Sequence, residues 1–110
     1  MKTEINAQEL SEIVLQMSLA LGYSLAKHSE FPSRATYLRG EELDIRLNEE
    51  RKFNDGGNES MLSVLKEESL EFASEYSKGN YEEAEKEGYH VMAVAARMVL
   101  AARNMKKGKK

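Results

Sequence analysis

Apolar residues recur at helical spacing in almost every segment of this chain, and no segment alternates apolar and polar residues with a period of two. A half-buried strand requires that alternation, so the sequence predicts helices and no sheet. The composition agrees, because Glu, Lys, Leu, Ala and Met are abundant and Pro32 is the single proline among 110 residues. A chain of this length is expected to form one domain. We therefore expect an all-α protein.

Four helices are expected from the apolar spacing and from residues that cap helix ends. The first is predicted over 7–27, where Asn6 and Glu9 match a capping box. Its apolar face consists of six residues, namely Leu10, Ile13, Val14, Met17, Leu21 and Leu25. The other three helices are predicted over 41–53, 59–77 and 81–104. From Val91 onward the last of these is apolar nearly all round, which is typical of a buried central helix.

Three loops separate the predicted helices. Pro32 biases the preceding residue away from helix, and the run Asn-Asp-Gly-Gly-Asn over 54–58 is the strongest turn signal in the chain. Gly79 ends the third helix, and Asn80 is the expected N-cap of the fourth, with Glu83 three residues later. Because this connection is short, the third and fourth helices should be antiparallel neighbours. We expect a four-helix bundle-like domain over 1–105, in which a helical hairpin forms the core and the first helix is an addition.

Charge and composition exclude several classes of protein. The net charge is −3 even though the tail over 106–110 contains four lysines, so the rest of the chain is acidic and should bind duplex nucleic acid poorly. We expect that tail to be a flexible, solvated end.

The longest apolar stretch, 91–102, contains Arg97 and is too short to cross a bilayer. Without cysteine, disulfides and thiolate metal sites are excluded, and the first ten residues lack the apolar core of a secretory signal. A cytoplasmic protein is expected, in the host cytoplasm if a phage encodes it.

Acidic residues with one histidine form the clearest candidate site. Glu68 and Glu71 are three residues apart on the third predicted helix, and Glu87 and His90 are three apart on the fourth. An antiparallel hairpin would bring these two pairs together. Carboxylates suit Mg²⁺, and Mn²⁺ tolerates an imidazole ligand better. The alternative is a solvated acidic surface, which spacing alone does not exclude.

These residues belong to a longer pattern. Segments 65–72, 79–80 and 87–95 together resemble the MazG-like all-α nucleoside triphosphate pyrophosphohydrolases, whose motifs are Glu-Glu-x-x-Glu on one helix and Glu-x-x-Asp on the next. Segment 50–55 resembles the Glu-Arg-x-x-Gln-Asp segment of short phage and bacterial members. The likeness extends over about 46–103 and leaves the first helix uncovered.

This resemblance implies Mg²⁺-dependent cleavage of a (deoxy)nucleoside triphosphate to the monophosphate and pyrophosphate. It implies metal ligands at Glu68, Glu71, Glu87 and His90, where His90 occupies the position of the motif Asp. It implies that Glu67 either supports the metal ligands or is the carboxylate that activates water. Residues implied to bind the nucleotide are Arg51, Lys52, Lys78 and Tyr81. The family builds such sites between helices and across subunits, which implies a homo-oligomer, either a dimer or a tetramer.

Two further hypotheses remain open beside this one. The same scaffold, with His90 weakening the metal site, would bind nucleotides without turnover, as a phage regulator or a sequestering protein. Alternatively, the chain forms a purely structural helical oligomer. The apolar faces of the first and fourth helices exceed what one small domain needs, so a symmetric homo-oligomer is expected in each case.

Overall fold

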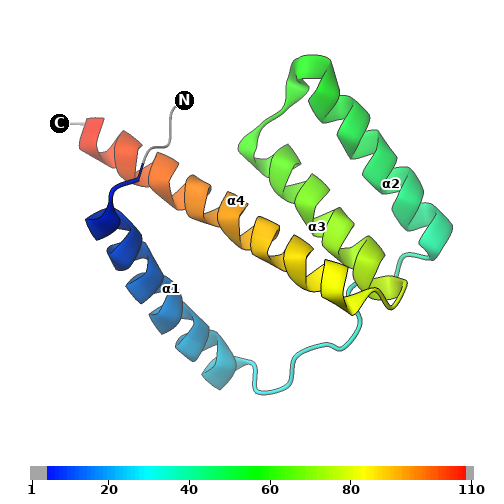
Figure 1. The fold of residues 1–110 in the computed structure, drawn as a ribbon, viewed down its shortest axis with the longest axis horizontal. Helices are drawn as coiled ribbons and strands as arrows, with labels where there is room; N and C mark the ends of the chain where they lie inside the picture. The colour runs from blue at the N-terminus through cyan, green and yellow to red at the C-terminus, as the bar shows by residue number, and fades with distance from the viewer. Residues whose placement is uncertain (1–4, 109–110) are drawn as a thin grey trace. The chain divides into compact units, whose positions relative to one another are not determined.

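The computed structural model describes residues 5–108, and this part of the chain is helical with no strand (Figure 1). The elements are α1 (Ala7–Lys27), α2 (Gly40–Phe53), the π-helical turn η1 (Asn54–Asn58), α3 (Met61–Ser77) and α4 (Tyr81–Gly108). The prediction of an all-α fold is confirmed. None of the described helices combines the length and apolarity needed to traverse a lipid bilayer.

The chain divides into two compact units. One comprises residues 34–98 and holds α2, α3 and the larger part of α4. The other comprises residues 5–33 and 99–108, and it holds α1 and the last turns of α4. All of the candidate site residues belong to the first of these units.

Within the unit 34–98, α2 and α3 lie side by side and run antiparallel, joined by η1 (Figure 1). Gly57 adopts φ 83°, a conformation that glycine enters without steric cost, so the predicted turn reverses the chain here. α3 begins two residues after the predicted start, which was placed at about 59. The Ser60 side chain accepts a hydrogen bond from the Ser63 N–H, and the Ser63 hydroxyl accepts one from the Ser60 N–H. This reciprocal cap places the first helical residue at Met61.

The connection between α3 and α4 is a tight Schellman turn. Gly79 has φ 80°, its N–H donates to the Tyr76 carbonyl, and the Asn80 N–H donates to the Glu75 carbonyl. Asn80 precedes α4 as predicted, and its carbonyl accepts the first helical bond, from Ala84. The predicted capping box with Glu83 does not form, because the Asn80 N–H is already bound to Glu75. Glu83 instead forms an ion pair with Lys86 at 3.1 Å.

The core of this unit is small. Its buried apolar side chains are Leu43 and Leu47 from α2, Ala73 from α3 and Ala84 from α4. Leu43 is the only large side chain of the described residues that is almost fully excluded from solvent, at 1% exposed. Two polar links also join α2 to α3, from Arg51 to Glu71 and from the Ser74 hydroxyl to Asp44.

In the other unit, α1 begins where Asn6 caps it, since the Asn6 Oδ1 accepts a hydrogen bond from the Glu9 N–H at 2.8 Å. The helix ends at Lys27 as predicted. Two ion pairs tie α1 to the end of α4, Arg103 to Glu12 and Lys107 to Glu9. α4 continues to Gly108 and does not stop at about 104 as predicted. The first residues of the predicted lysine-rich tail are therefore helical, while 109–110 lie outside the described residues.

The apolar face predicted for α1 is largely exposed within one chain, and the prediction that α4 is buried from Val91 onward is wrong. Of the six apolar positions predicted for α1, Ile13 alone is buried. In α4, Met92 and Val99 are 46% and 47% exposed, although this stretch was predicted to be central. A helix that is apolar all round is buried only if neighbours surround it, and a chain with four helices has too few.

Candidate metal centre

Three side chains of the α3–α4 hairpin converge on one point. Glu68 comes from α3, and Glu87 and His90 come from α4, three residues apart on one face. Each offers one possible ligand atom, and these atoms all lie within 4.8 Å of one another. The structure thus brings together three of the four residues predicted as metal ligands.

The imidazole of His90 lies beside both carboxylates. Its Nδ1 lies 3.3 Å from Glu87 Oε2 and 3.8 Å from Glu68 Oε2. The Glu68 Oε2 atom is buried and has no hydrogen-bond partner. A buried acceptor without a partner is costly, so this atom is suited to bind a cation.

The fourth predicted ligand, Glu71, occupies a different position. Its Oε1 accepts a hydrogen bond from Arg51 Nη2 at 3.3 Å, which links α3 to α2. Glu71 is also close enough to Glu87 for the two carboxyl groups to interact. Glu71 therefore lies beside the three converging side chains and is paired with the Arg51 side chain.

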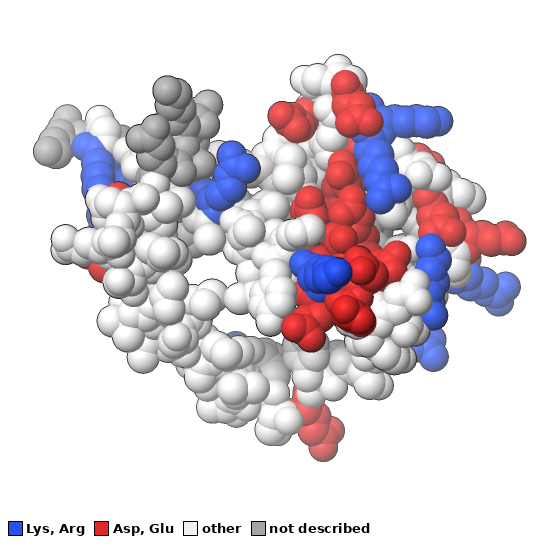
Figure 2. Space-filling view, in the orientation of Figure 1, with Lys and Arg blue, Asp and Glu red and all other residues white. Residues whose placement is uncertain are grey.

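Crowding of carboxylates perturbs their titration. Burial raises the pKa of Glu68, and the neighbouring Glu71 charge raises it further. Burial and the adjacent Glu87 carboxyl likewise raise the pKa of Glu71, against the opposing effect of Arg51. Figure 2 shows Asp and Glu side chains gathered into one patch on the unit 34–98. A bound cation would relieve this repulsion.

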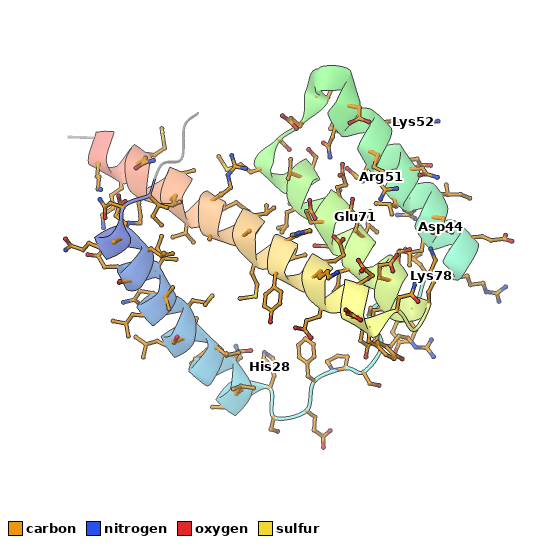
Figure 3. All side chains as sticks on the ribbon, in the orientation of Figure 1. His28, Asp44, Arg51, Lys52, Glu71 and Lys78 are labelled. Atoms are coloured by element: carbon orange, nitrogen blue, oxygen red, sulfur yellow. The ribbon has the colours of Figure 1, made fainter. Side chains whose placement is uncertain are left out.

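A polar cavity of about 430 Å³ adjoins the cluster, a size typical of small-molecule sites. Its lining residues come from α2, α3 and α4 and are mostly charged or polar: Asp44, Leu47, Asn48, Arg51, Glu71, Ser74, Glu75, Lys78 and Glu87. Arg51 pairs with Glu71, and Lys78 lies 3.7 Å from Asp44 (Figure 3). Glu87 belongs to both the cavity and the three converging side chains, so the two are continuous.

Comparisons of the chain with protein-family models, with curated proteins and with solved structures found no match.

Two residues predicted to bind the nucleotide lie away from this cavity. Lys52 is exposed on α2 and is not among the lining residues, because it is one position beyond Arg51 and so faces another side of the helix (Figure 3). Tyr81 is 64% exposed, and its ring packs edge-on against Tyr76 at 5.4 Å. Arg51 and Lys78 are the two predicted residues that do line the cavity.

Glu67, the predicted water-activating residue, is held by a residue that the sequence analysis missed. Asn54 Nδ2 donates to Glu67 Oε1 at 2.9 Å and to the Ser63 carbonyl at 3.3 Å. The Asn54 Oδ1 is buried without a partner. Asn54 was interpreted only as part of a turn, and its side chain orients the Glu67 carboxylate.

Asp44, Asn48 and Ser74 were also missed. Asp44, Asn48 and Arg51 are spaced i, i+4 and i+7 along α2 and therefore share one face. That spacing is visible in the sequence as a polar stripe along the helix. α2 shows only a weak apolar pattern because one of its faces is polar, and this polar face is turned toward α3.

The donor set fits a divalent cation. Two carboxylates and one imidazole, beside a third carboxylate, match what Mn²⁺ accepts, while Mg²⁺ prefers oxygen ligands alone. The buried, unpartnered Glu68 Oε2 supports this fit independently of the motif.

The raised pKa of Glu68 predicts how stability depends on pH without metal. The pKa of the Glu68 carboxyl is higher in the folded protein than in the unfolded chain. The free energy of unfolding therefore falls as the pH rises from the unfolded pKa to the folded pKa. Glu68→Gln cannot ionise, so in a chelator it should be more stable than the unmodified chain at pH 7. We expect a gain below about 1 kcal/mol, because the site is partly exposed. Thermal melts would show the gain vanishing below about pH 4, where Glu68 is neutral in both states. A gain that does not change with pH would contradict this account of the cluster.

Proposed function

We propose that this chain is a metal-dependent nucleoside triphosphate pyrophosphohydrolase of the MazG-like type, which cleaves a (deoxy)nucleoside triphosphate to the monophosphate and pyrophosphate. The observation that carries the proposal is the convergence of Glu68, Glu87 and His90 at the edge of a polar cavity. The motif resemblance of these segments supports the same assignment.

Glu68, Glu87 and His90 would hold the cation, with Glu71 beside them. When bound, Mg²⁺ or Mn²⁺ would neutralise charge on the phosphates and lower the pKa of a water molecule. The imidazole at position 90 favours Mn²⁺ over Mg²⁺ relative to a site of four carboxylates.

The chain's own cations would bind the phosphate groups. Arg51 and Lys78 line the cavity, and each is paired with one carboxylate at present. An incoming triphosphate would compete for Arg51, whose planar guanidinium binds phosphate oxygens in pairs. Release of Glu71 from Arg51 would then free its carboxylate for the cation, so substrate and metal binding would support each other.

Glu67 would accept the proton of the attacking water. Asn54 holds one oxygen of its carboxylate, which orients the group and leaves the other oxygen to act as base. Asn54 is thereby a positioning residue.

A second candidate function rests on His90. The MazG-like motif has an aspartate at this position, so a site with His90 carries one negative charge fewer. A hard cation such as Mg²⁺ would bind such a site more weakly. A chain that binds nucleotides with little turnover, as a regulator or a sequestering protein, is therefore the alternative. Pyrophosphate and monophosphate release, assayed over a panel of nucleoside triphosphates with Mg²⁺ or Mn²⁺, separates the two: product supports the enzyme, and binding without product supports the alternative.

The proposal includes a homo-oligomer acting in the cytoplasm. Uncovered apolar side chains on α1 and α4 support association, because a small domain gains stability by burying such surface between copies.

Arg51 and its neighbour Lys52 provide a matched pair of variants. Arg51→Ala should raise KM for the triphosphate by about 10-fold or more, because it removes a charge-assisted bond to phosphate. Lys52→Ala removes the same charge from an exposed position outside the cavity and should change KM by less than about twofold. Steady-state kinetics on both variants would test this. Equal effects would mean that general surface charge, and not the cavity, binds the nucleotide.

A further inference from the structure

Helix α1 carries a long surface without charge. No charged residue occurs over 13–26, and large apolar side chains are exposed throughout this stretch. Between its ends, the side of α1 visible in Figure 2 shows neither acidic nor basic side chains. An exposed apolar surface of this extent on one helix is typical of a protein interface.

One face of α1 has a pattern of large and small residues that is distinct from the predicted apolar face. Leu15, Leu19, Gly22 and Ala26 are spaced i, i+4, i+7 and i+11, which places them on a single seam. Leu15 and Leu19 are 58% and 59% exposed. Gly22 and Ala26 are exposed as well.

Gly22 supplies an independent observation. It lies in the interior of an exposed helix, where glycine costs about 0.5–1 kcal/mol relative to alanine. A Cβ built on Gly22 would meet nothing within 4 Å. Among the described residues 5–108, no neighbour therefore requires a glycine here, whereas close approach of another helix would.

We propose that α1 pairs with α1 of a second copy in antiparallel orientation, with Leu19 of each copy packed over Gly22 of the partner subunit. A two-fold axis between positions 20 and 21 pairs position 19 with 22 and position 15 with 26. Each leucine then meets a glycine or an alanine, which lets the helix axes approach closely. The pattern is complementary to itself only in this orientation, and this identifies the occupant as a second copy.

The helix dipoles of α1 favour the same orientation. The acidic residues near its start, Glu9 and Glu12, are already paired with Lys107 and Arg103 of the same chain, so their charges do not choose between the two orientations. Parallel pairing would align the two dipoles and stack leucine on leucine, whereas antiparallel pairing opposes the dipoles and places each leucine against a small residue. This inference specifies an interface for the proposed homo-oligomer and does not depend on catalysis.

The test exchanges the large and small residues. Sedimentation equilibrium on the full chain should give twice the 12.5 kDa chain mass. Gly22→Leu should weaken dimerisation at least about 10-fold, since it overfills the seam twice by symmetry. Combining it with Leu19→Ala should restore the dimer, because the large and small residues are then exchanged across the axis. Ser24→Leu adds the same side chain on another side of α1 and serves as the control.

Crosslinking provides a second measurement that does not require a destabilised variant. The chain has no cysteine, so Leu15→Cys with Ala26→Cys should form interchain disulfides under mild oxidation, and Leu15→Cys alone should not. A monomeric mass, or an oligomer unaffected by Gly22→Leu, would overturn the proposed seam. An oligomer unaffected by Gly22→Leu would mean that the copies associate through another surface. Neither result would bear on the metal centre, which nucleotide and metal assays test separately.

Discussion

Glu68→Gln is expected to reduce affinity for Mn²⁺ and Mg²⁺ at least about 100-fold. Replacing a residue that only hydrogen-bonds to a metal ligand already reduces affinity about 10- to 100-fold, and replacing a ligand itself should cost at least as much. The carboxylate is central to the site, because its Oε2 is buried without a partner and lies next to His90. Pyrophosphate release should fall with metal affinity. Isothermal titration of the metal, together with product assays, measures both.

Glu83→Gln is the matched control for this variant. Glu83 is also a helical glutamate with one ion-pair partner, Lys86, but it lies outside the three converging side chains. Its replacement should leave metal affinity within about twofold. If Glu68→Gln unfolds the protein, or if it binds metal as well as Glu83→Gln does, Glu68 is structural and the metal centre is wrongly assigned.

His90→Asp is expected to raise Mg²⁺ affinity about 10-fold and to create or increase pyrophosphate release, because a carboxylate adds a negative charge and an oxygen ligand. The fold should tolerate the change, since the His90 side chain is 60% exposed and an aspartate there buries no charge. Without metal, the added repulsion from Glu68 and Glu87 should lower the melting temperature slightly, and Mg²⁺ should restore it.

The control for His90→Asp is His90→Asn, which provides an oxygen ligand without the charge. If the charge governs affinity for Mg²⁺, the asparagine variant should show little of the gain. A His90→Asp protein that melts much lower and acquires neither metal binding nor turnover would exclude position 90 as a ligand.

The local sequence signals predicted the helices well. α1 has the predicted limits because Asn6 caps its start, and the α3–α4 hairpin forms because Gly79 closes a Schellman turn. Both features depend on residues a few positions apart. α3 begins two residues later than predicted because Ser60 and Ser63 cap each other, whereas the usual capping box has Glu or Gln at the third position.

Features that depend on distant residues were predicted less completely. The hairpin brought Glu68, Glu87 and His90 together, as spacing and antiparallel packing imply. The pairing of Glu71 with Arg51 depends on how α2 lies against α3, which the spacing within either helix does not determine. The apolar faces of α1 and α4 were identified, but periodicity shows which side of a helix is apolar and not what covers it.

We infer that Glu68, Glu87 and His90 bind one divalent cation, and pulsed electron paramagnetic resonance of bound Mn²⁺ would detect the nitrogen ligand. We expect one ion per chain, with a ¹⁴N modulation from a directly bound imidazole that disappears in His90→Asp while the ion stays bound. Absence of Mn²⁺ binding, or binding whose ¹⁴N modulation is the same in the two proteins, would contradict the claim.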